Sequence, residues 1–212
     1  AVAPGGEVMG ADISGTLLAV ARDRAAELDG VRFVEADAQT HPFETGRFDA
    51  VFSRFGVMFF ADPAAAFANI QRAVKPGGRL AFVCWRRPDE NPIMTLPMAA
   101  AAPFLPPPAP PEPGAPGPFA FADPDRIRAV LGAGGFADIT VTPHDEKVGA
   151  GDLDTVLAMT LKVGPLGAML RDHPDKRDTV IAAVRTALAP HEGPDGVKLD
   201  SATWIVNARK PA

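Results

Sequence analysis

The sequence predicts an α/β fold built on a mostly parallel sheet, and three observations indicate it. Short apolar runs that suit buried strands alternate with helical patterns over residues 7–85. Prolines and capping residues mark the helix starts, and glycines mark the turns between elements. A segment of alternating character near the C-terminus, residues 198–209, predicts a last strand.

The first predicted unit is a strand, a helix and a second strand. Residues 7–12 and 31–35 are the strands, because each is a short, mostly apolar run that ends at or near an acid. Ser14 is placed to cap the intervening helix, and Gly30 to end it. Apolar residues recur on one face of that helix, which we expect to be buried; they are Leu17, Ala21, Ala25 and Leu28.

The same signals predict the remaining elements. Asp62 and Pro63 mark a helix start, with an N-cap acid followed by a proline in the first turn. Residues 75–78 predict a tight turn, because proline sets φ at its second position and glycine allows positive φ at its third. Further strands are expected at 47–53, 79–85 and 136–142, and further helices from Asp123, at 152–162 and at 176–188.

Two segments do not fit the alternation, and we expect them to decorate a single domain spanning residues 1–212. Residues 86–122 include the stretch 103–118, in which nine of sixteen residues are proline, so neither helix nor strand is expected there. This segment is an extended surface excursion or, in the functional alternative, part of a lid over a substrate pocket. Residues 150–190 are expected to form a helical insertion.

Composition narrows the classes of function. The chain has 212 residues and a formal net charge of −5, which argues against nucleic acid or an anionic membrane as a partner. One cysteine and four scattered histidines do not predict a metal site. No apolar run reaches the roughly 20 residues of a membrane-spanning helix, and no signal peptide is recognisable, so a cytoplasmic protein is expected.

Polar residues follow three of the predicted strands, where ligands bind in open parallel sheets. Asp12 ends the first strand, Asp37 follows the second, and Ser53 and Arg54 follow the third. One ionised carboxylate can accept hydrogen bonds from both hydroxyls of a ribose, and a second can accept from an adenine amino group. Either acid alone is equally well explained as a helix or turn cap, but the pair predicts an adenosine site.

Four motifs occur in a distinctive order: VMGADIS at residues 8–14, VRFVEADA at 31–38, FDAVFS at 48–53 and VKPGGRL at 74–80. In this order and spacing they resemble class I S-adenosylmethionine-dependent methyltransferases, in the type 11 branch that is similar to quinone-biosynthesis methyltransferases. The resemblance implies a Rossmann-like sheet whose last strand, at residues 201–209, is antiparallel.

The resemblance also implies S-adenosyl-L-methionine as the cofactor, and methyl transfer to a small molecule by in-line displacement. Asp12 corresponds to the acid that binds the ribose hydroxyls, and Asp37 to the acid that reads the adenine edge. The cofactor-binding residues that it implies are Asp12, Ile13, Asp37, Ala38, Ser53, Arg54 and Phe55.

One part of the family pattern has no counterpart. The family's first strand and glycine-rich loop precede the ribose-binding acid by roughly 20 residues, whereas only residues 1–11 precede Asp12 here. We therefore expect a chain truncated at its N-terminus. Its sheet should lack that strand and have unpaired edges at the gap.

Candidate residues for the methyl acceptor follow the third and fourth strands. Met58, Phe59 and Trp85 would line a pocket for an apolar or aromatic acceptor, and the alternative is simple core packing. His41 is the candidate base for a hydroxyl acceptor, although a loop histidine is more often an ordinary surface residue. The acceptor atom and the oligomeric state do not follow from the sequence.

Three functions remain open at this point. The first is a small-molecule methyltransferase, and the second is a non-catalytic methyltransferase-like module that cannot bind the donor. The third is a nicotinamide-dependent oxidoreductase, since an acid ending a second strand also holds a ribose there. The turn at residues 75–78, the second acid Asp37 and the lack of a G-x-G-x-x-G motif favour methyl transfer.

Overall fold

The computed structural model describes residues 5–107, 112, 114–149, 151–162 and 165–212. The strands are β1 (Val8–Asp12), β2 (Val31–Glu35), β3 (Phe48–Arg54), β4 (Val74–Trp85), β5 (Ala137–Gly149), β6 (Glu192–Gly193) and β7 (Gly196–Arg209). The α-helices are α1 (Gly15–Arg24), α2 (Pro63–Ala73), α3 (Pro92–Ala101), α4 (Pro124–Ala133), α5 (Leu153–Lys162), α6 (Pro165–Asp172) and α7 (Arg177–Leu188). Short 3-10 helices are η1 (Val57–Phe59), η2 (Pro88–Glu90), η3 (Pro174–Lys176) and η4 (Ala189–His191).

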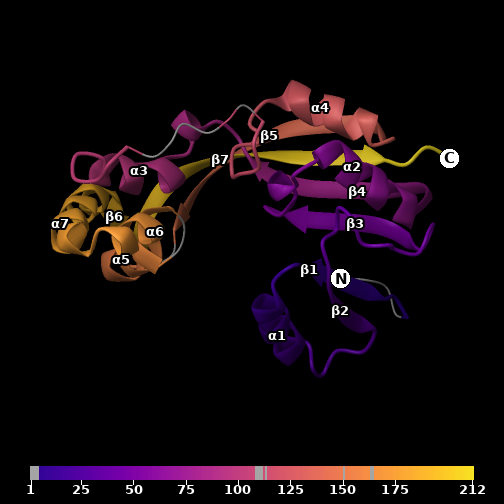
Figure 1. Ribbon diagram of the computed structural model, residues 1–212, viewed down its shortest axis with the longest axis horizontal. Coiled ribbons are helices and arrows are strands. Elements are labelled where there is room, and N and C mark those ends of the chain that lie inside the picture. Colours follow the sequence, from indigo (N-terminus) through magenta and orange to yellow (C-terminus); the bar gives the residue numbers. More distant parts are fainter. Residues whose placement is uncertain (1–4, 108–111, 113, 150, 163–164) are drawn as a thin grey trace.

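The strands of the described chain form two separate sheets (Figure 1). β1 and β2 are a parallel pair, with Val8 opposite Val31 and Asp12 opposite Glu35. The larger sheet has the order β3-β4-β7-β5, in which β3 and β4 are parallel, β7 is antiparallel to both its neighbours, and β6 pairs with β7. The predicted α/β fold with an antiparallel last strand is confirmed. The expected interruption separates β1 and β2 from the larger sheet.

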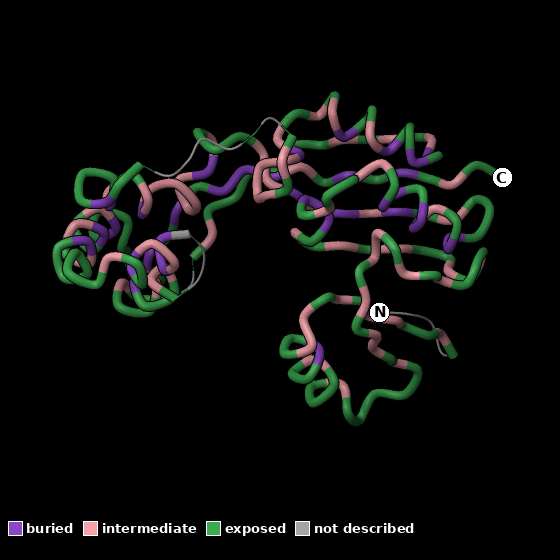
Figure 2. The backbone as a smooth tube through the Cα atoms, viewed as in Figure 1, coloured by how far each residue is buried: buried purple, intermediate pink, exposed green. Residues whose placement is uncertain are grey.

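The main hydrophobic core lies between the larger sheet and helices α2 and α4 (Figure 2). Asp62 caps α2 as predicted, because its carboxylate accepts a backbone N–H at 3.0 Å. Alternate residues of β4, including Leu80 and Phe82, are buried in this core. Phe67 of α2 stacks on Phe82 with ring centroids 5.7 Å apart and contacts Phe121 at 6.1 Å. Such aromatic pairs contribute about 0.5–1.5 kcal/mol beyond the area they bury.

A second hydrophobic core lies in a helical lobe at one end of the long strands β5 and β7 (Figure 1). Helices α3, α5, α6 and α7 pack there against the first half of β7, where Val197 and Leu199 are buried. The expected helical insertion accounts for α5 to α7. Among the described residues no single helix is both long and apolar enough to cross a membrane; the bent pair formed by α5 and α6 meets only the criteria of length and composition.

Helix α3 corrects the expectation that residues 86–122 form only an extended excursion. Pro92 lies in its first turn, where a backbone N–H has no helical partner and its loss costs nothing. Pro97 lies inside the helix and removes one hydrogen bond. Burial offsets that loss, since Pro97 and Ala101 are both buried and α3 packs on α7.

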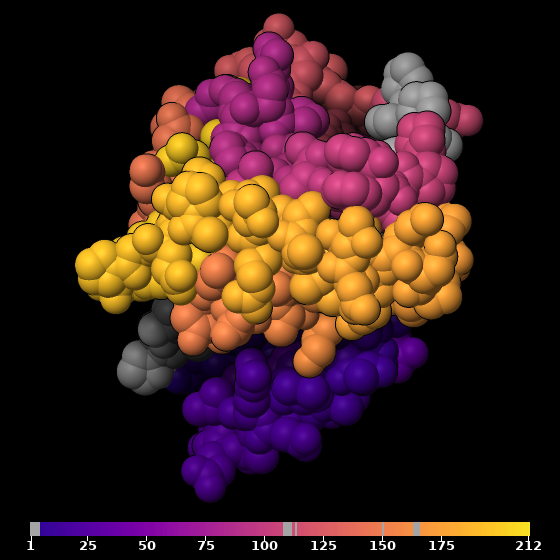
Figure 3. Space-filling view, turned by 90° about the vertical axis from the view of Figure 1, so that its left-hand side faces the viewer, coloured from indigo at the N-terminus to yellow at the C-terminus, as the bar shows by residue number. Residues whose placement is uncertain are grey.

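The β1–α1–β2 unit has almost no core of its own. Ser14 caps α1 as predicted, with its Oγ accepting the Leu17 N–H at 3.2 Å. Among the described residues of this unit only Leu18 is buried (Figure 2). The predicted buried face is wrong, since Leu17 and Leu28 are 62% and 60% exposed and α1 ends at Arg24. That face has no layer of described residues to pack against, and the unit forms a mass of its own in Figure 3.

Candidate functional site

Asp12 lies at the carboxyl end of β1, next to the start of α1. Its backbone carbonyl accepts the Ala36 N–H at 2.9 Å, which joins the tips of β1 and β2. Its Oδ1 accepts the Ser14 N–H at 2.8 Å, which fixes the side chain in a local turn. Within the described residues Oδ2 makes no hydrogen bond. The carboxylate therefore retains acceptor capacity for a ligand.

Asp37 lies two residues beyond the end of β2. Its Oδ1 accepts the Gln39 N–H at 2.8 Å, again in a local turn, and its backbone carbonyl accepts the His41 N–H at 2.8 Å. Because β1 and β2 are parallel neighbours, both carboxylates lie at the same end of one strand pair. The structure thus brings the two predicted acids to adjacent strand tips.

The residues that follow the two acids, Ile13 and Ala38, differ in exposure. Ile13 is 74% exposed and so presents an apolar surface beside Asp12. Ala38 is half-buried, and its carbonyl accepts a hydrogen bond from Asn69 Nδ2 at 2.9 Å. Asn69 is 7% exposed and also donates to the His41 carbonyl at 2.9 Å. Asn69 was not predicted as a positioning residue, because its only signal in the sequence is a polar side chain between the buried positions of α2.

The chain turns sharply after β3, and the stacked rings of Phe55 and Trp85 form an aromatic platform there. Ser53 is half-buried, Arg54 is exposed, and Phe55 follows with a φ of 60°. A bulky residue rarely takes this left-handed conformation, so the turn is strained. The Phe55 N–H donates to the Val83 carbonyl at 3.0 Å, and its ring stacks on Trp85 with centroids 4.3 Å apart and planes at 13°. Side chains from two strand ends therefore form one flat apolar surface.

Two of the expected acceptor residues differ sharply in exposure. Met58 is 1% exposed and belongs to the main core, so the alternative of core packing, rather than contact with an acceptor, describes this residue. Phe59, the next residue, is 55% exposed. The Gly117 N–H donates to the Met58 carbonyl at 3.0 Å, which docks the end of the proline-rich segment on η1. Residues 108–111 and 113 of that segment lie outside the described residues.

His41 and Cys84 are the remaining side chains with reactive groups near these strand ends. The His41 ring is half-buried and packs edge-on against Phe43, with centroids 4.7 Å apart. The expected role of His41 as a base stays a prediction. Burial raises the pKa of the Cys84 thiol to about 12, so this thiol stays protonated and is a poor nucleophile.

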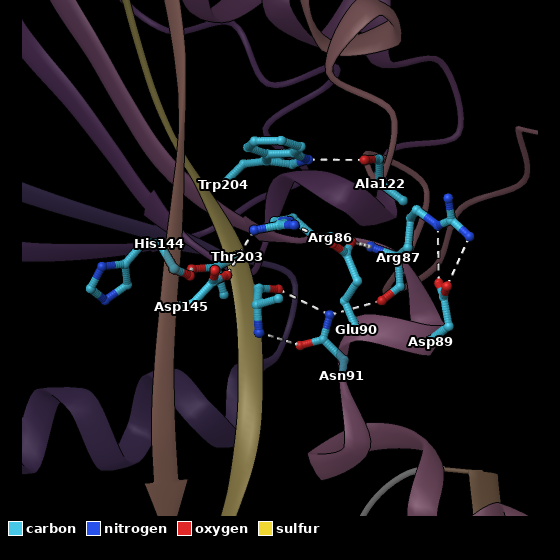
Figure 4. Close-up of polar contacts among 11 residues, drawn as sticks. Arg86, Arg87, Asp89, Glu90, Asn91, Ala122, His144, Asp145, Thr203 and Trp204 are labelled. Carbon is cyan, nitrogen blue, oxygen red and sulfur yellow. Dashed lines mark hydrogen bonds and ion pairs between the residues drawn. The ribbon is translucent and has the colours of Figure 1, made fainter.

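A cluster of polar contacts beyond Trp85 joins the end of β4 to the helical lobe (Figure 4). The Arg86 guanidinium forms an ion pair with Asp145 at 2.7 Å and lies 4.9 Å above the centre of the Trp204 ring. Asn91 is fully buried and exchanges two hydrogen bonds with the backbone of Ala202, at 2.8 and 3.0 Å. Local sequence patterns cannot predict the contacts of Arg86 with Asp145 and Trp204 or of Asn91 with Ala202, because these partners are 59 to 118 residues apart along the chain.

The two ends of S-adenosyl-L-methionine, the donor implied by the sequence, are matched to different extents by the residues of this site. Its nucleoside end carries hydroxyl and amino donors, and Asp12 and Asp37 present the matching acceptors from adjacent strand tips. Its amino-acid end would lie toward β3, and β1 and β3 belong to separate sheets. No glycine-rich strand-to-helix turn lies at that edge among the described residues. Within the described residues, the acceptors that match the donor are therefore grouped at the tips of β1 and β2.

Comparison with known sequences agrees with the resemblance. Residues 1–82 match the family described as methyltransferase domain. A demethylmenaquinone methyltransferase of Thermus thermophilus is 47% identical over 91 residues, which cover 42% of this chain and 41% of that protein. A ubiquinone/menaquinone biosynthesis C-methyltransferase of Marinomonas is 36% identical over 89 residues, covering 41% and 36%. The match thus spans about two fifths of each of these relatives.

Comparison with solved structures extends the likeness to the whole fold. The YcgJ protein of Bacillus subtilis covers 97% of this chain and 83% of its own, with a TM-score of 0.59 and 16% identity. A phosphoethanolamine N-methyltransferase of Haemonchus contortus, solved with S-adenosyl-L-methionine, covers 97% and 44%, with a TM-score of 0.53 and 20% identity. Residues 1–82 are therefore similar to the methyltransferase domain family, and the chain shares the Rossmann-like fold of these solved structures.

Proposed function

We propose that this chain acts in S-adenosylmethionine-dependent methyl transfer to a small, apolar or aromatic molecule. The observation that carries the proposal is the pair of carboxylates, Asp12 and Asp37, at the tips of two paired parallel strands. The bound donor would supply a methyl group activated by its positive sulfonium. The residues of the chain would supply binding, alignment and exclusion of water.

The nucleoside end of the donor would be held by the β1–α1–β2 unit. Asp12 would accept hydrogen bonds from the ribose hydroxyls, and Asp37 from the adenine amino group. Ile13, which is 74% exposed, would cover one face of the base. Ala38 would lie along the adenine edge, on a loop that Asn69 anchors to α2.

The acceptor would lie over the platform at the ends of β3 and β4. The stacked rings of Phe55 and Trp85 present a flat apolar surface, and Phe59 adds exposed apolar area nearby. A planar ring such as the quinones named in two relatives has the matching chemistry. Ser53 and Arg54 would face the donor from the end of β3, and His41 would remove a proton only from a hydroxyl acceptor.

The experiment is calorimetric titration of the protein with S-adenosylhomocysteine, the product form of the donor. Asp12→Asn and Asp37→Asn should each weaken binding roughly tenfold or more, since a hydrogen bond to a charged group contributes about 1.5–3 kcal/mol. Asp23→Asn on α1 removes the same charge from an exposed site and should leave binding unchanged.

Two outcomes would contradict the proposal. Equal binding by the Asp12, Asp37 and Asp23 variants would remove the carboxylate pair from the site. No binding, either by the chain or by the chain completed with a strand between β1 and β3, would support a non-catalytic module instead. Titration with NAD under the same conditions tests the oxidoreductase alternative.

A further inference from the structure

The Phe55 ring is held on Trp85 by an unusual piece of backbone. Phe55 follows the last residue of β3 and has a φ of 60°, in the left-handed region that bulky residues rarely adopt. Its ring nevertheless lies flat on the Trp85 ring, with centroids 4.3 Å apart and planes at 13°. Strain of this kind is typical of ligand sites and switch regions, and this residue lies at the ligand-binding edge of the sheet.

Trp85 is the fixed member of the stacked pair. It is the last residue of β4 and lies opposite Thr203 of β7. The next N–H, that of Arg86, donates to the Ala202 carbonyl at 3.1 Å, and the Arg86 guanidinium pairs with Asp145 at 2.7 Å. Contacts on both sides of the strand end therefore hold the indole in a defined place in the sheet.

Phe55 is the less constrained member of the pair. The next residue, Gly56, is exposed, and a Cβ placed there would meet one atom within 4 Å, the Ser53 hydroxyl oxygen at 3.1 Å. The chain then enters η1, a single short turn in which the Phe59 N–H bonds to the Gly56 carbonyl at 3.3 Å. The backbone around Phe55 therefore has room to relax toward an unstrained φ, which would turn its ring away from Trp85.

The strain at Phe55 and its stacking on Trp85 oppose each other and are of the same order. A larger planar ring on Trp85 would keep the gain from stacking and remove the strain, because Phe55 would be free to relax. An aliphatic chain would remove the same strain but would not replace the ring that leaves. Since a ligand shifts such a balance only by its differential interaction with the two states, a fused aromatic ring is favoured over a chain.

We infer that the Phe55 ring occupies the place of the methyl acceptor, and that an acceptor with fused aromatic rings binds by displacing Phe55 and stacking on Trp85. Phe55 is then a specificity-determining residue, because a ligand has to stack on the indole better than a single benzene ring does. The inference deepens the proposed function, on which it rests for the place of the acceptor at the ends of β3 and β4. It narrows the acceptor class to planar molecules of two or more fused rings.

The test uses 2-naphthol as the probe, without any methyl donor. Calorimetric titration gives its dissociation constant, and nuclear Overhauser contacts between ring protons report which rings touch. In the free chain the Phe55 and Trp85 rings should show mutual contacts, as their separation requires. Saturating 2-naphthol should abolish those contacts and replace them with contacts between the probe and Trp85. Phenol, which has a single ring, should leave the contacts between Phe55 and Trp85 in place.

A matched pair of variants separates displacement from simple contact. Glycine adopts a φ of 60° without strain, so Phe55→Gly vacates the indole face and should bind 2-naphthol about tenfold more tightly than the parent, because no ring has to leave first. Phe52→Gly removes an exposed ring that lies opposite Ala81, four residues before Trp85, and should leave binding unchanged. Unchanged amide exchange at Val206, which is buried in β7, verifies that both variants are folded.

Three results would overturn the inference. Equal or weaker binding by Phe55→Gly would show that the probe lies on the Phe55 ring or elsewhere, and so would contacts between Phe55 and Trp85 that persist at saturating 2-naphthol. No binding by either the parent or Phe55→Gly would remove the ring site from the platform. The readout uses no donor, so its failure is separate from that of the proposed function. Displacement of Phe55 by 2-naphthol without binding of S-adenosylhomocysteine would leave the ring site and refute methyl transfer.

Discussion

The β1–α1–β2 unit and the sheet formed by β3, β4, β7 and β5 are built from the same alternation of strands and helices, yet they are buried very differently. Around the larger sheet, residues of both helix α2 and strand β4 are fully buried, and Phe67 of α2 has 0% exposure. In the smaller unit, Leu18 is the buried residue among those described (Figure 2). The motifs are equally clear in both, but a core forms only where a second layer is present.

The comparison shows what a strand pair lacks without a sheet around it. Parallel strands are normally buried on both faces, and two strands alone are marginally stable. The smaller unit is tied to the rest by Asn69, by the Glu7–Arg47 ion pair and by the chain itself. It should therefore open before the larger sheet unfolds.

The largest expected effect is in the main core. Phe67→Ala removes a fully buried ring that contacts four other phenylalanines, so the free energy of unfolding should fall by about 3–5 kcal/mol. Urea unfolding followed by circular dichroism measures it. A loss below about 1 kcal/mol would contradict the description of this core.

A smaller effect is expected where the two regions join. Asn69→Ala leaves the carbonyls of Ala38 and His41 without their donor, which should cost about 1–3 kcal/mol. Exchange should speed up at residues 36–41 and stay unchanged in β7. Asn207→Ala, at an exposed position of β7, is the control and should be nearly neutral. Equal effects of the two changes would refute the anchoring role of Asn69.

The smaller unit should respond weakly to loss of its one buried apolar side chain. Leu18→Ala should lower the free energy of unfolding by no more than about 2 kcal/mol, the low end for buried leucines. The reason is that no other described residue of this unit is buried beside Leu18. Exchange within β1 and β2 should nevertheless rise clearly. A loss as large as that of Phe67→Ala would mean that the two regions share one cooperative core.

The smallest effect concerns an ion pair at the start of β3. The hydrogen bond and the charge of Lys75 lower the pKa of the Asp49 carboxyl. A lowered pKa stabilises the folded state above the ordinary value of about 4, and this stabilisation is lost as pH falls through the folded pKa. Asp49→Asn should lower the melting temperature slightly at pH 7 and make no difference near pH 2. A difference that grows at low pH would contradict this account.

Much of the fold was predictable because its signals are local. The caps at Ser14 and Asp62 are formed as predicted. Residues 75–78, predicted as a tight turn, instead belong to β4, where the pairing with β3 is irregular and Gly77 has a positive φ of 73°. The antiparallel last strand followed from family resemblance rather than from periodicity. Helix α3 was not predictable from propensity, because Pro97 in its interior is tolerated only through packing in the helical lobe.

In the candidate site, as in the fold, the positions set by local signals were predictable and those set by distant contacts were not. Asp12 and Asp37 lie at adjacent strand tips because the order of elements alone dictates this position. Met58 and Phe59 are sequence neighbours of similar hydrophobicity, and only the fold distinguishes the buried one from the exposed one. Asn69 and the Arg86 cluster depend on contacts between distant segments, which a single sequence does not reveal.

The central claim is that β1 and β2 form a strand pair separate from the larger sheet, whose edge is β3, and residue-resolved amide exchange of the chain alone tests it most directly. The account predicts an alternating pattern along β3: slow exchange at Val51, Ser53 and Phe55, which face β4, and fast exchange at Phe52 and Arg54, which face the gap. Uniformly slow exchange along β3 in dilute protein would contradict it, because the edge would then already be paired.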